Sequence, residues 1–153
     1  MKHWRNKTKK EKLKDITVVI RCAGERTEAL CYKLVTDQVP AERVFCIRET
    51  PFSEALRKNF EVGIREGKPW TFAVDADILP AHKIFERMLK YAEQMPAKTF
   101  ELHSNIVDKL MGNVRQGGIK LYRTDLLQMA AKLIPNPEDA IRPEHHVLEK
   151  MKV

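Results

Sequence analysis

Two carboxylates separated by one residue are the side chains of this sequence with the clearest chemical use. Asp75 and Asp77 follow the apolar run at residues 70–74. Side chains of a strand alternate between its faces, so residues i and i+2 point the same way. Mg²⁺ and Mn²⁺ take oxygen ligands, usually one or two protein carboxylates together with waters and substrate phosphates. Asp75 and Asp77 are therefore candidate ligands for Mn²⁺ or Mg²⁺. The alternative is that they end a strand and cap the next helix.

Three strand–helix units are predicted to position these aspartates. Apolar runs indicate strands at residues 15–22, 43–48 and 70–75, and helical spacing of apolar residues follows each of them. The predicted helices cover residues 25–38, residues 52–64 after Pro51, and a segment from Pro80 onward. Strand and helix in alternation predict an α/β fold with a mostly parallel sheet between helices. Ligands bind at the carboxyl ends of such strands, which is where Asp75 and Asp77 fall.

The second half of the chain has a less regular pattern. Residues 99–103 and 117–122 are predicted strands, and a helix is expected from residue 124 to residue 133. Proline residues break that helix, and Pro143 opens a final short helix over residues 142–151. The three cysteines, Cys22, Cys31 and Cys46, form no Cys-x-x-Cys pair. We interpret them as reduced thiols of the core.

Composition favours one folded domain with a basic N-terminal arm. The 153 residues carry a net charge of +7, and 43% of them are hydrophobic. Seven Lys or Arg against one Glu in residues 1–14 account for +6 of that charge. We therefore predict a flexible basic tail at residues 1–14 and a single domain at residues 15–153. The tail is a solvated arm in this interpretation, with contact to an anionic lipid or nucleic-acid surface as the alternative.

The same sequence gives no sign of membrane insertion or secretion. No apolar run approaches the roughly 20 residues that a membrane-spanning helix requires. The basic N-terminus lacks the apolar segment that a secretory signal carries behind its charges. We therefore expect no transmembrane segment and a cytoplasmic location.

The segment from Asn59 to Leu79 resembles the nucleotide-sugar half of glycosyltransferase family 2 and related GT-A fold enzymes. In that family an asparagine-bearing helix precedes an apolar strand that ends in Asp-x-Asp. Residues 16–26 are similar to the family's first strand and loop, and Gly117-Gly118 followed by residues 119–126 looks like its glycine-led strand and helix. The resemblance spans most of residues 15–150. It implies a GT-A-like (Rossmann-like) domain in three α/β/α layers.

The resemblance implies inverting transfer of a sugar from a nucleotide-diphosphate donor to an acceptor hydroxyl. Mn²⁺ or Mg²⁺ at Asp77 would neutralise the leaving diphosphate, while Asp75 holds the ribose or shares the metal. A general base must take the acceptor proton. Glu144 is the first candidate and His145 the second, because an imidazole titrates near neutral pH. His146 is implied as a further metal ligand, the alternative being that both histidines are plain surface residues.

The resemblance also implies a set of donor-binding residues. Arg21 and Arg26 would face the diphosphate, and the two glycines would let the backbone approach the sugar. Glu49 stands where the family has acidic residues that hold base and ribose, but Arg48 and Thr50 flank it. The donor set is Arg21, Arg26, Glu49, Asn59, Asp75, Gly117 and Gly118.

Other classes of function stay open on the sequence. One is a catalytically silent GT-A-like module that binds a nucleotide or a protein. Another is a nucleic-acid-associated protein that uses the basic arm with Trp4 as a stacking residue. A sugar-phosphate nucleotidyltransferase would carry a glycine-rich basic loop after the first strand, and residues 22–26 hold only a trace of one. The acceptor is unidentified, and a homo-oligomer is also open.

Overall fold

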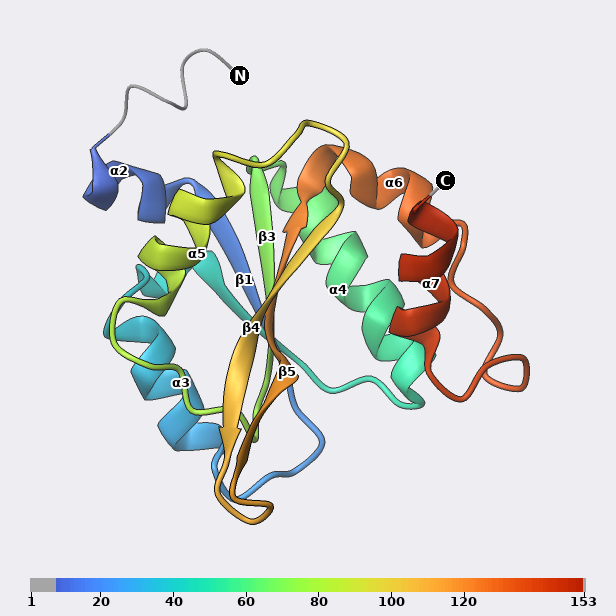
Figure 1. The fold of residues 1–153 in the computed structure, drawn as a ribbon, viewed down its shortest axis with the longest axis horizontal. Helices are drawn as coiled ribbons and strands as arrows, with labels where there is room; N and C mark the ends of the chain where they lie inside the picture. Colours follow the sequence, from blue (N-terminus) through green and yellow to red (C-terminus); the bar gives the residue numbers. More distant parts are fainter. Residues whose placement is uncertain (1–7, 153) are drawn as a thin grey trace.

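The computed structural model describes residues 8–152 and contains a five-stranded mixed sheet with helices on both faces (Figure 1). The strand order is β2-β1-β3-β5-β4. β1 (Ile16–Arg21) lies between β2 (Val44–Ile47) and β3 (Trp70–Asp75), and all three are parallel. β5 (Asn113–Arg123) is antiparallel to β3 and to β4 (Glu101–Asp108). The predicted α/β fold class is confirmed.

Two cores, one on each face of the sheet, give the domain its three layers. α3 (Glu28–Thr36) and α5 (Ile84–Ala92) share one core with Val18, Ile20 and Val74. The opposite face is covered by helices that pack with Ala73 and Tyr122. Because neighbouring residues of a strand point to opposite faces, β3 contributes to both of these cores. β1 contributes to the first core and, through Val19, to a smaller cluster with Ile47 and Val62. The covering helices of this second face are α4 (Phe52–Glu66), α6 (Leu127–Ala131) and α7 (Pro143–Met151).

Glycine allows α4 to pack closely on the sheet. A Cβ atom at Gly63 would lie 2.5 Å from Thr71 Oγ1 and 2.8 Å from Leu127 Cδ1. At the end of the helix, Gly67 adopts the left-handed conformation, with φ 61°, and caps it. These two positions fix the distance of α4 from β3 and the point at which the chain turns toward that strand.

The second half of the chain differs from its predicted elements in three places. β4 and β5 are longer than the predicted 99–103 and 117–122 and form a hairpin that projects past the sheet. The helix expected at 124–133 is divided into a 3₁₀ turn, Thr124–Leu126, and α6. The helix expected from Pro80 begins only at Ile84, because Lys83 before it is left-handed, with φ 59°.

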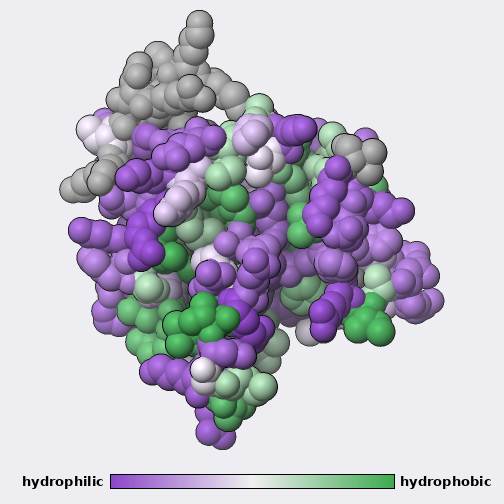
Figure 2. Space-filling model, viewed as in Figure 1, coloured by the Kyte–Doolittle hydropathy of each residue, from purple (hydrophilic) through white to green (hydrophobic). Residues whose placement is uncertain are grey.

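The projecting part of the hairpin exposes apolar side chains. Figure 2 shows apolar surface at the lower end of the molecule, where the hairpin ends. Leu110 is 94% exposed, and Val107, Met111 and Val114 are also exposed. Cross-strand backbone pairing, which polar residues can make as well as apolar ones, continues from Asn105↔Gln116 to Asp108↔Asn113.

The N-terminal segment contains a short helix where a flexible tail was expected. α2 (Lys9–Lys14) begins after Thr8, whose side chain accepts a hydrogen bond from Glu11 N while the Glu11 carboxylate accepts one from Thr8 N. Lys12 forms an ion pair with Glu93, next to the end of α5. Residues 1–7, including Trp4, lie outside the described residues. No helix among residues 8–152 is long and apolar enough to cross a bilayer.

The cysteines are only partly where the sequence indicated. Cys22 and Cys31 are buried, and burial raises the pKa of their thiols to about 12 and about 11. Cys46 is exposed on the edge strand β2, so its assignment to the core is wrong. An edge strand offers one side to solvent, which an apolar run of sequence does not reveal.

Replacing Gly63 by Ala should lower the free energy of unfolding by up to about 2 kcal/mol, because overpacking costs about 1–3 kcal/mol and the gain in helix propensity is about 1 kcal/mol. Urea denaturation measures this change. In a Thr71→Ala background the same substitution should cost less, since both contacting Thr71 atoms are gone. An equal cost in both backgrounds would contradict the close contact between α4 and β3.

Candidate functional site

Both aspartates lie at the carboxyl end of β3, beside the end of β1. Arg21 and Asp75 are partners in the parallel register, and Ala76 N donates to Arg21 O at 3.0 Å. Ala76 is fully buried, whereas the Asp75 side chain is 33% exposed and Asp77 is exposed. The side chains on either side of Ala76 therefore reach the surface at the edge where α/β sheets bind ligands.

Arg21 is buried between two carboxylates. Its Nε donates to Asp75 Oδ1 at 2.8 Å and its Nη1 donates to Glu144 Oε1 at 2.5 Å. The guanidinium carbon lies 4.9 Å from the centre of the Phe52 ring, and the side chain is 4% exposed. Burial lowers the pKa of Arg21, but Glu144 and Asp75 together raise it above its ordinary value. Arg21 is therefore a buried charged group whose Nε and Nη1 are both occupied by protein carboxylates.

Glu144 lies in the first turn of α7 and accepts hydrogen bonds from three side chains. Besides Arg21, the Tyr122 hydroxyl donates to its Oε1 at 3.1 Å, and Lys120 Nζ lies 3.0 Å from its Oε2. Burial raises the pKa of Glu144, but Arg21 and Lys120 lower it below its ordinary value overall. A carboxylate stabilised in this way is a weak proton acceptor.

The polar network continues from β5 to β4. Lys120 and Tyr122 are the register partners of His103 and Glu101. The Glu101 side chain is 5% exposed, and it lies 3.2 Å from His103 Nδ1. Burial, and to a smaller extent the charge of Glu144, raise the pKa of Glu101. The sheet face beside α7 thus carries a row of polar groups that starts at Arg21.

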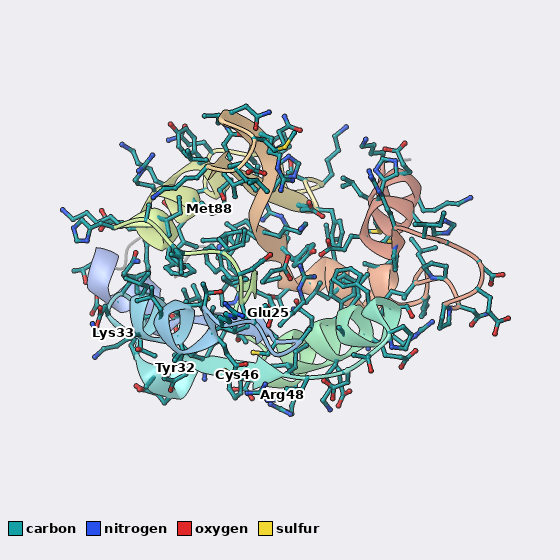
Figure 3. All side chains as sticks on the ribbon, turned by 90° about the horizontal axis from the view of Figure 1, so that it is seen from below. Glu25, Tyr32, Lys33, Cys46, Arg48 and Met88 are labelled. Atoms are coloured by element: carbon teal, nitrogen blue, oxygen red, sulfur yellow. The ribbon has the colours of Figure 1, made fainter. Side chains whose placement is uncertain are left out.

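The residues predicted to bind the donor do not form one cluster. Two of these residues, Arg26 and Glu49, lie in loops at one end of the sheet. Figure 3, a view from below, labels their chain neighbours Glu25, in the β1–α3 loop, and Arg48, after β2. Arg26 is exposed in this loop, and Glu49 is exposed with its Oε2 accepting from Arg48 N at 3.0 Å. Asn59 is 0% exposed inside α4, so its side chain does not reach the surface.

The glycine pair serves strand pairing. A Cβ at Gly118 would lie 2.4 Å from Ser104 Oγ, which accepts a hydrogen bond from Ile119 N at 2.9 Å. Gly117 has φ 111°, next to the irregularity between His103 and Asn105 on β4. A bulge that brings two backbones close explains both glycines without a bound sugar.

Among residues 8–152, no group of three or more His, Cys, Asp or Glu side chains is arranged to hold a metal ion. The structure therefore does not gather Asp75, Asp77 and His146 into one ligand set; His146 is half-buried on α7 and His145 is exposed. Within the same residues, Asp75 Oδ2 and the Asp77 carboxylate have no hydrogen-bond partner. Two such carboxylates fit a hard divalent cation whose other ligands are waters and phosphates.

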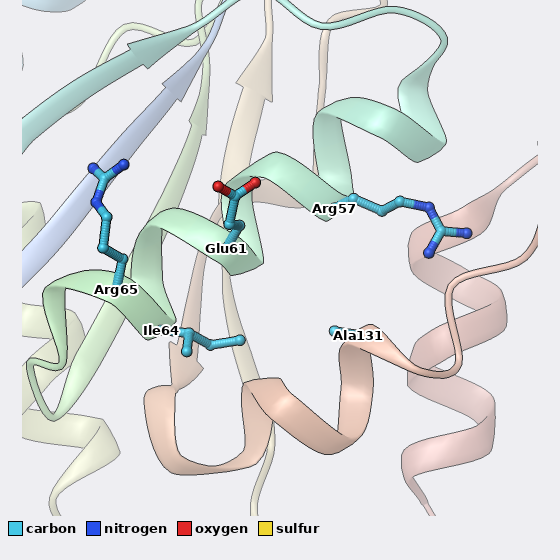
Figure 4. Close-up of a pocket in the computed structure, with 5 residues that line it drawn as sticks. All are labelled: Arg57, Glu61, Ile64, Arg65 and Ala131. Carbon is cyan, nitrogen blue, oxygen red and sulfur yellow. The ribbon is translucent and has the colours of Figure 1, made fainter.

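A separate cavity lies on the outer side of α4. It has a volume of about 430 Å³ and is lined by Arg57, Glu61, Ile64 and Arg65 of α4 with Ala131 at the end of α6 (Figure 4). None of the side chains that line it belongs to the network around Arg21. The aspartate edge and this cavity are therefore distinct surfaces.

Sequence reasoning missed Lys120, Tyr122 and Phe52 as members of the site. Lys120 and Tyr122 are two residues apart in a predicted strand, a spacing that places them on one face. That spacing does not tell which helix covers the face. Only the position of α7 brings Glu144 to them.

Comparison with known proteins indicates the fold alone. No protein-family model matches the sequence, and no curated protein matches it. A197 from STIV has a TM-score of 0.63 at 10% identity over 90% of this chain and 78% of its own. A cytidylyltransferase from Leptospira borgpetersenii serovar Hardjo-bovis has a TM-score of 0.62 at 10% identity over 91% of this chain and 71% of its own.

A glycosyltransferase also has a similar structure. The enzyme involved in glycosylating the major capsid of PBCV-1 has a TM-score of 0.57 at 12% identity, over 90% of this chain and 76% of its own. The chain therefore has an α/β fold that a glycosyltransferase and a nucleotidyltransferase also have.

Replacing Glu144 by Gln should destabilise the protein most near neutral pH. The folded-state pKa of Glu144 lies below the ordinary value of 4.5, so its stabilising effect is complete above that pH and is lost as the pH falls through the folded pKa. The variant should lose about 3 kcal/mol of unfolding free energy at neutral pH, because a buried charge loses its partner. Urea denaturation across a pH series should show this difference narrowing on acidification.

Glu149→Gln on the same helix is the matched control. Glu149 is paired with Lys152 at the surface, and its side chain is 50% exposed. Its replacement should leave the urea midpoint nearly unchanged at each pH. A wild-type advantage over Glu144→Gln that stays constant down to about pH 3.5 would mean that the Glu144 charge does not stabilise the fold.

Proposed function

We propose that this chain is a metal-dependent glycosyltransferase that takes a nucleotide-diphosphate sugar and transfers the sugar, with inversion, to an acceptor hydroxyl. The observation that carries the proposal is the pair Asp75 and Asp77 at the carboxyl edge of the sheet. Asp77 is exposed and Asp75 is partly exposed, and Asp75 Oδ2 and both Asp77 carboxylate oxygens have no hydrogen-bond partner among the described residues. The fold supports it, because similar structures include a glycosyltransferase and a cytidylyltransferase.

The aspartates are proposed to hold Mn²⁺ or Mg²⁺ together with the donor diphosphate. Such a cation neutralises the charge that develops on the leaving diphosphate. Asp77 is the more accessible ligand, and Asp75 contributes the oxygen that Arg21 leaves free. Arg26, exposed in the β1–α3 loop at the same edge, is proposed as a second positive charge near the phosphates.

The acceptor proton is proposed to go to His145. Glu144, our first candidate on the sequence, has its carboxylate occupied by Arg21, Lys120 and Tyr122. His145 follows it on α7 and is exposed to solvent, so its ring is open to an acceptor. Imidazole is the commonest general base in enzymes.

A catalytically silent nucleotide-binding module is the second candidate. The ion pairs of Glu144 favour this candidate. Glu144 is the carboxylate nearest the aspartates in the contacts described above, and it is occupied by Arg21 and Lys120, so it is not free to act as a base. The two candidates predict the same metal and nucleotide binding. They differ in turnover, which the silent module lacks.

Mn²⁺ and a nucleoside diphosphate together should raise the melting temperature, and Asp77→Ala should abolish the rise. Ligand at about 100 times its Kd stabilises the folded state by about 2.7 kcal/mol, which corresponds to several degrees. Differential scanning fluorimetry with uridine, guanosine, adenosine and cytidine diphosphates measures the effect.

Asp125→Ala provides the control. Asp125 is also exposed, but it follows β5 at the opposite end of the sheet, near the start of β3. This variant should keep the full thermal shift. If Asp77→Ala kept it as well, Asp77 would not be a metal ligand.

His145→Ala should slow turnover of the donor by about 100-fold or more, with donor affinity nearly unchanged, because general bases contribute about 10²–10⁴ in rate. Release of nucleoside diphosphate from the nucleotide sugar that stabilises the protein most is the measurement. His146→Ala should turn over at a rate close to wild type. Full activity of His145→Ala would exclude His145 as the base, and binding without turnover in wild type would favour the silent module.

A further inference from the structure

The carboxylates of Asp75 and Glu144 face the same guanidinium from different sides. Arg21 Nε binds one of them and Nη1 binds the other. Arg21 is held in place by burial and by the Phe52 ring, and Glu144 is held by Lys120 and Tyr122. The partly exposed Asp75 side chain is therefore held by Arg21, which is itself fixed by Glu144 of α7.

We propose that Arg21 and Glu144 are positioning residues of the cation site, with Arg21 orienting Asp75 and Glu144 offsetting the charge of Arg21. This inference rests on the proposed function, because it assigns Asp75 to a bound divalent cation. It gives Glu144 a role that acts through Arg21 and requires no contact with substrate.

Orientation is the first part of the argument. An aspartate at the end of a strand can turn about two side-chain bonds, and each free rotation spreads its oxygens over more positions. The Arg21 Nε–H fixes Asp75 Oδ1 at 2.8 Å and leaves Oδ2 as the oxygen without a protein partner. Donors that hold a ligand in this way are worth about 10–100-fold in metal affinity.

Charge is the second part of the argument. A guanidinium beside a metal ligand repels the incoming cation, and burial makes that repulsion stronger than it would be in water. Glu144 Oε1, 2.5 Å from Arg21 Nη1, offsets this charge from the side away from Asp75. The carboxylates of Asp75 and Glu144 balance the cations of Arg21 and Lys120, so the charge of Asp77 remains for the metal.

Stability alone is a poor explanation for such a network. Buried ion pairs are often no more stabilising than apolar side chains of the same volume, because desolvation offsets their attraction. The chain also contains a matched ion pair at the other end of the sheet. Arg43 donates to Ile16 O, Thr17 Oγ1 and Glu66 Oε2, and its side chain is 14% exposed. Arg43 therefore separates the loss of a structural arginine from the loss of a positioning one.

The test is the affinity for Mn²⁺ alone, measured from the electron paramagnetic resonance signal of free Mn²⁺. The full chain is compared with two variants. Arg21→Lys keeps the positive charge but loses the guanidinium group that bonds Asp75 and Glu144 at the same time. Glu144→Gln keeps the shape of the side chain but loses its negative charge. Each variant should raise the Kd for Mn²⁺ by about 10–100-fold. Arg43→Lys should leave this Kd unchanged while lowering the urea midpoint. Circular dichroism at the working temperature establishes that each variant is folded.

The outcomes are distinct. Wild-type affinity for Mn²⁺ in folded Arg21→Lys and Glu144→Gln would overturn the positioning role and leave the proposed function standing. Wild-type protein that shows no Mn²⁺ binding sensitive to Asp77→Ala would overturn both. If Arg21→Lys does not fold, the isosteric Glu144→Gln decides alone, because it removes the Glu144 charge and leaves Arg21 Nε bonded to Asp75 Oδ1.

Discussion

A positive charge buried at the end of β1 must have carboxylates beside it, and this requirement joins three distant parts of the chain. Arg21 is 4% exposed, and an unpaired charge in such a place costs several kcal/mol. Asp75 comes from β3 and Glu144 from α7, so the parallel strands and the last helix are held at one point. That point lies at the carboxyl edge of the sheet, beside the two accessible aspartates. The ion pairs of Arg21 that hold β3 and α7 together therefore also determine which groups surround the candidate site.

Much of the fold follows from the sequence, because a strand buried on both faces is a mostly apolar run. The predicted strands at 15–22, 43–48 and 70–75 differ from β1, β2 and β3 by one residue or less at each end. The length of the β4–β5 hairpin was underestimated, since cross-strand backbone pairing continues where the side chains, polar and apolar alike, are exposed. The helix at residues 9–14 was missed for a related reason: a capping box and one ion pair, not an apolar stripe, define it.

The site was predictable in position and much less so in its contacts. Asp75 could be placed at the end of a strand from local pattern alone. The partnership of Arg21 with Glu144 spans 123 residues and depends on where α7 packs. Asn59 shows the same limit, because helical spacing does not reveal that an amide points into the core, where neither of its polar atoms has a hydrogen-bond partner. Roles assigned by resemblance to Arg21 and Glu144 therefore differ from the ones that their contacts favour.

The β4–β5 hairpin extends past the end of β3, beside the aspartate edge, as a ribbon of only two strands. From Asn105 to Gln116 its side chains are exposed or half-buried, so little apolar area leaves water when this part is formed. Segments of that kind open locally at a lower free-energy cost than the whole domain, and their amide hydrogens exchange sooner. The ribbon can bend or separate while β1 and β3 stay paired. Opening of this side of the aspartate edge therefore needs no unfolding of the central sheet.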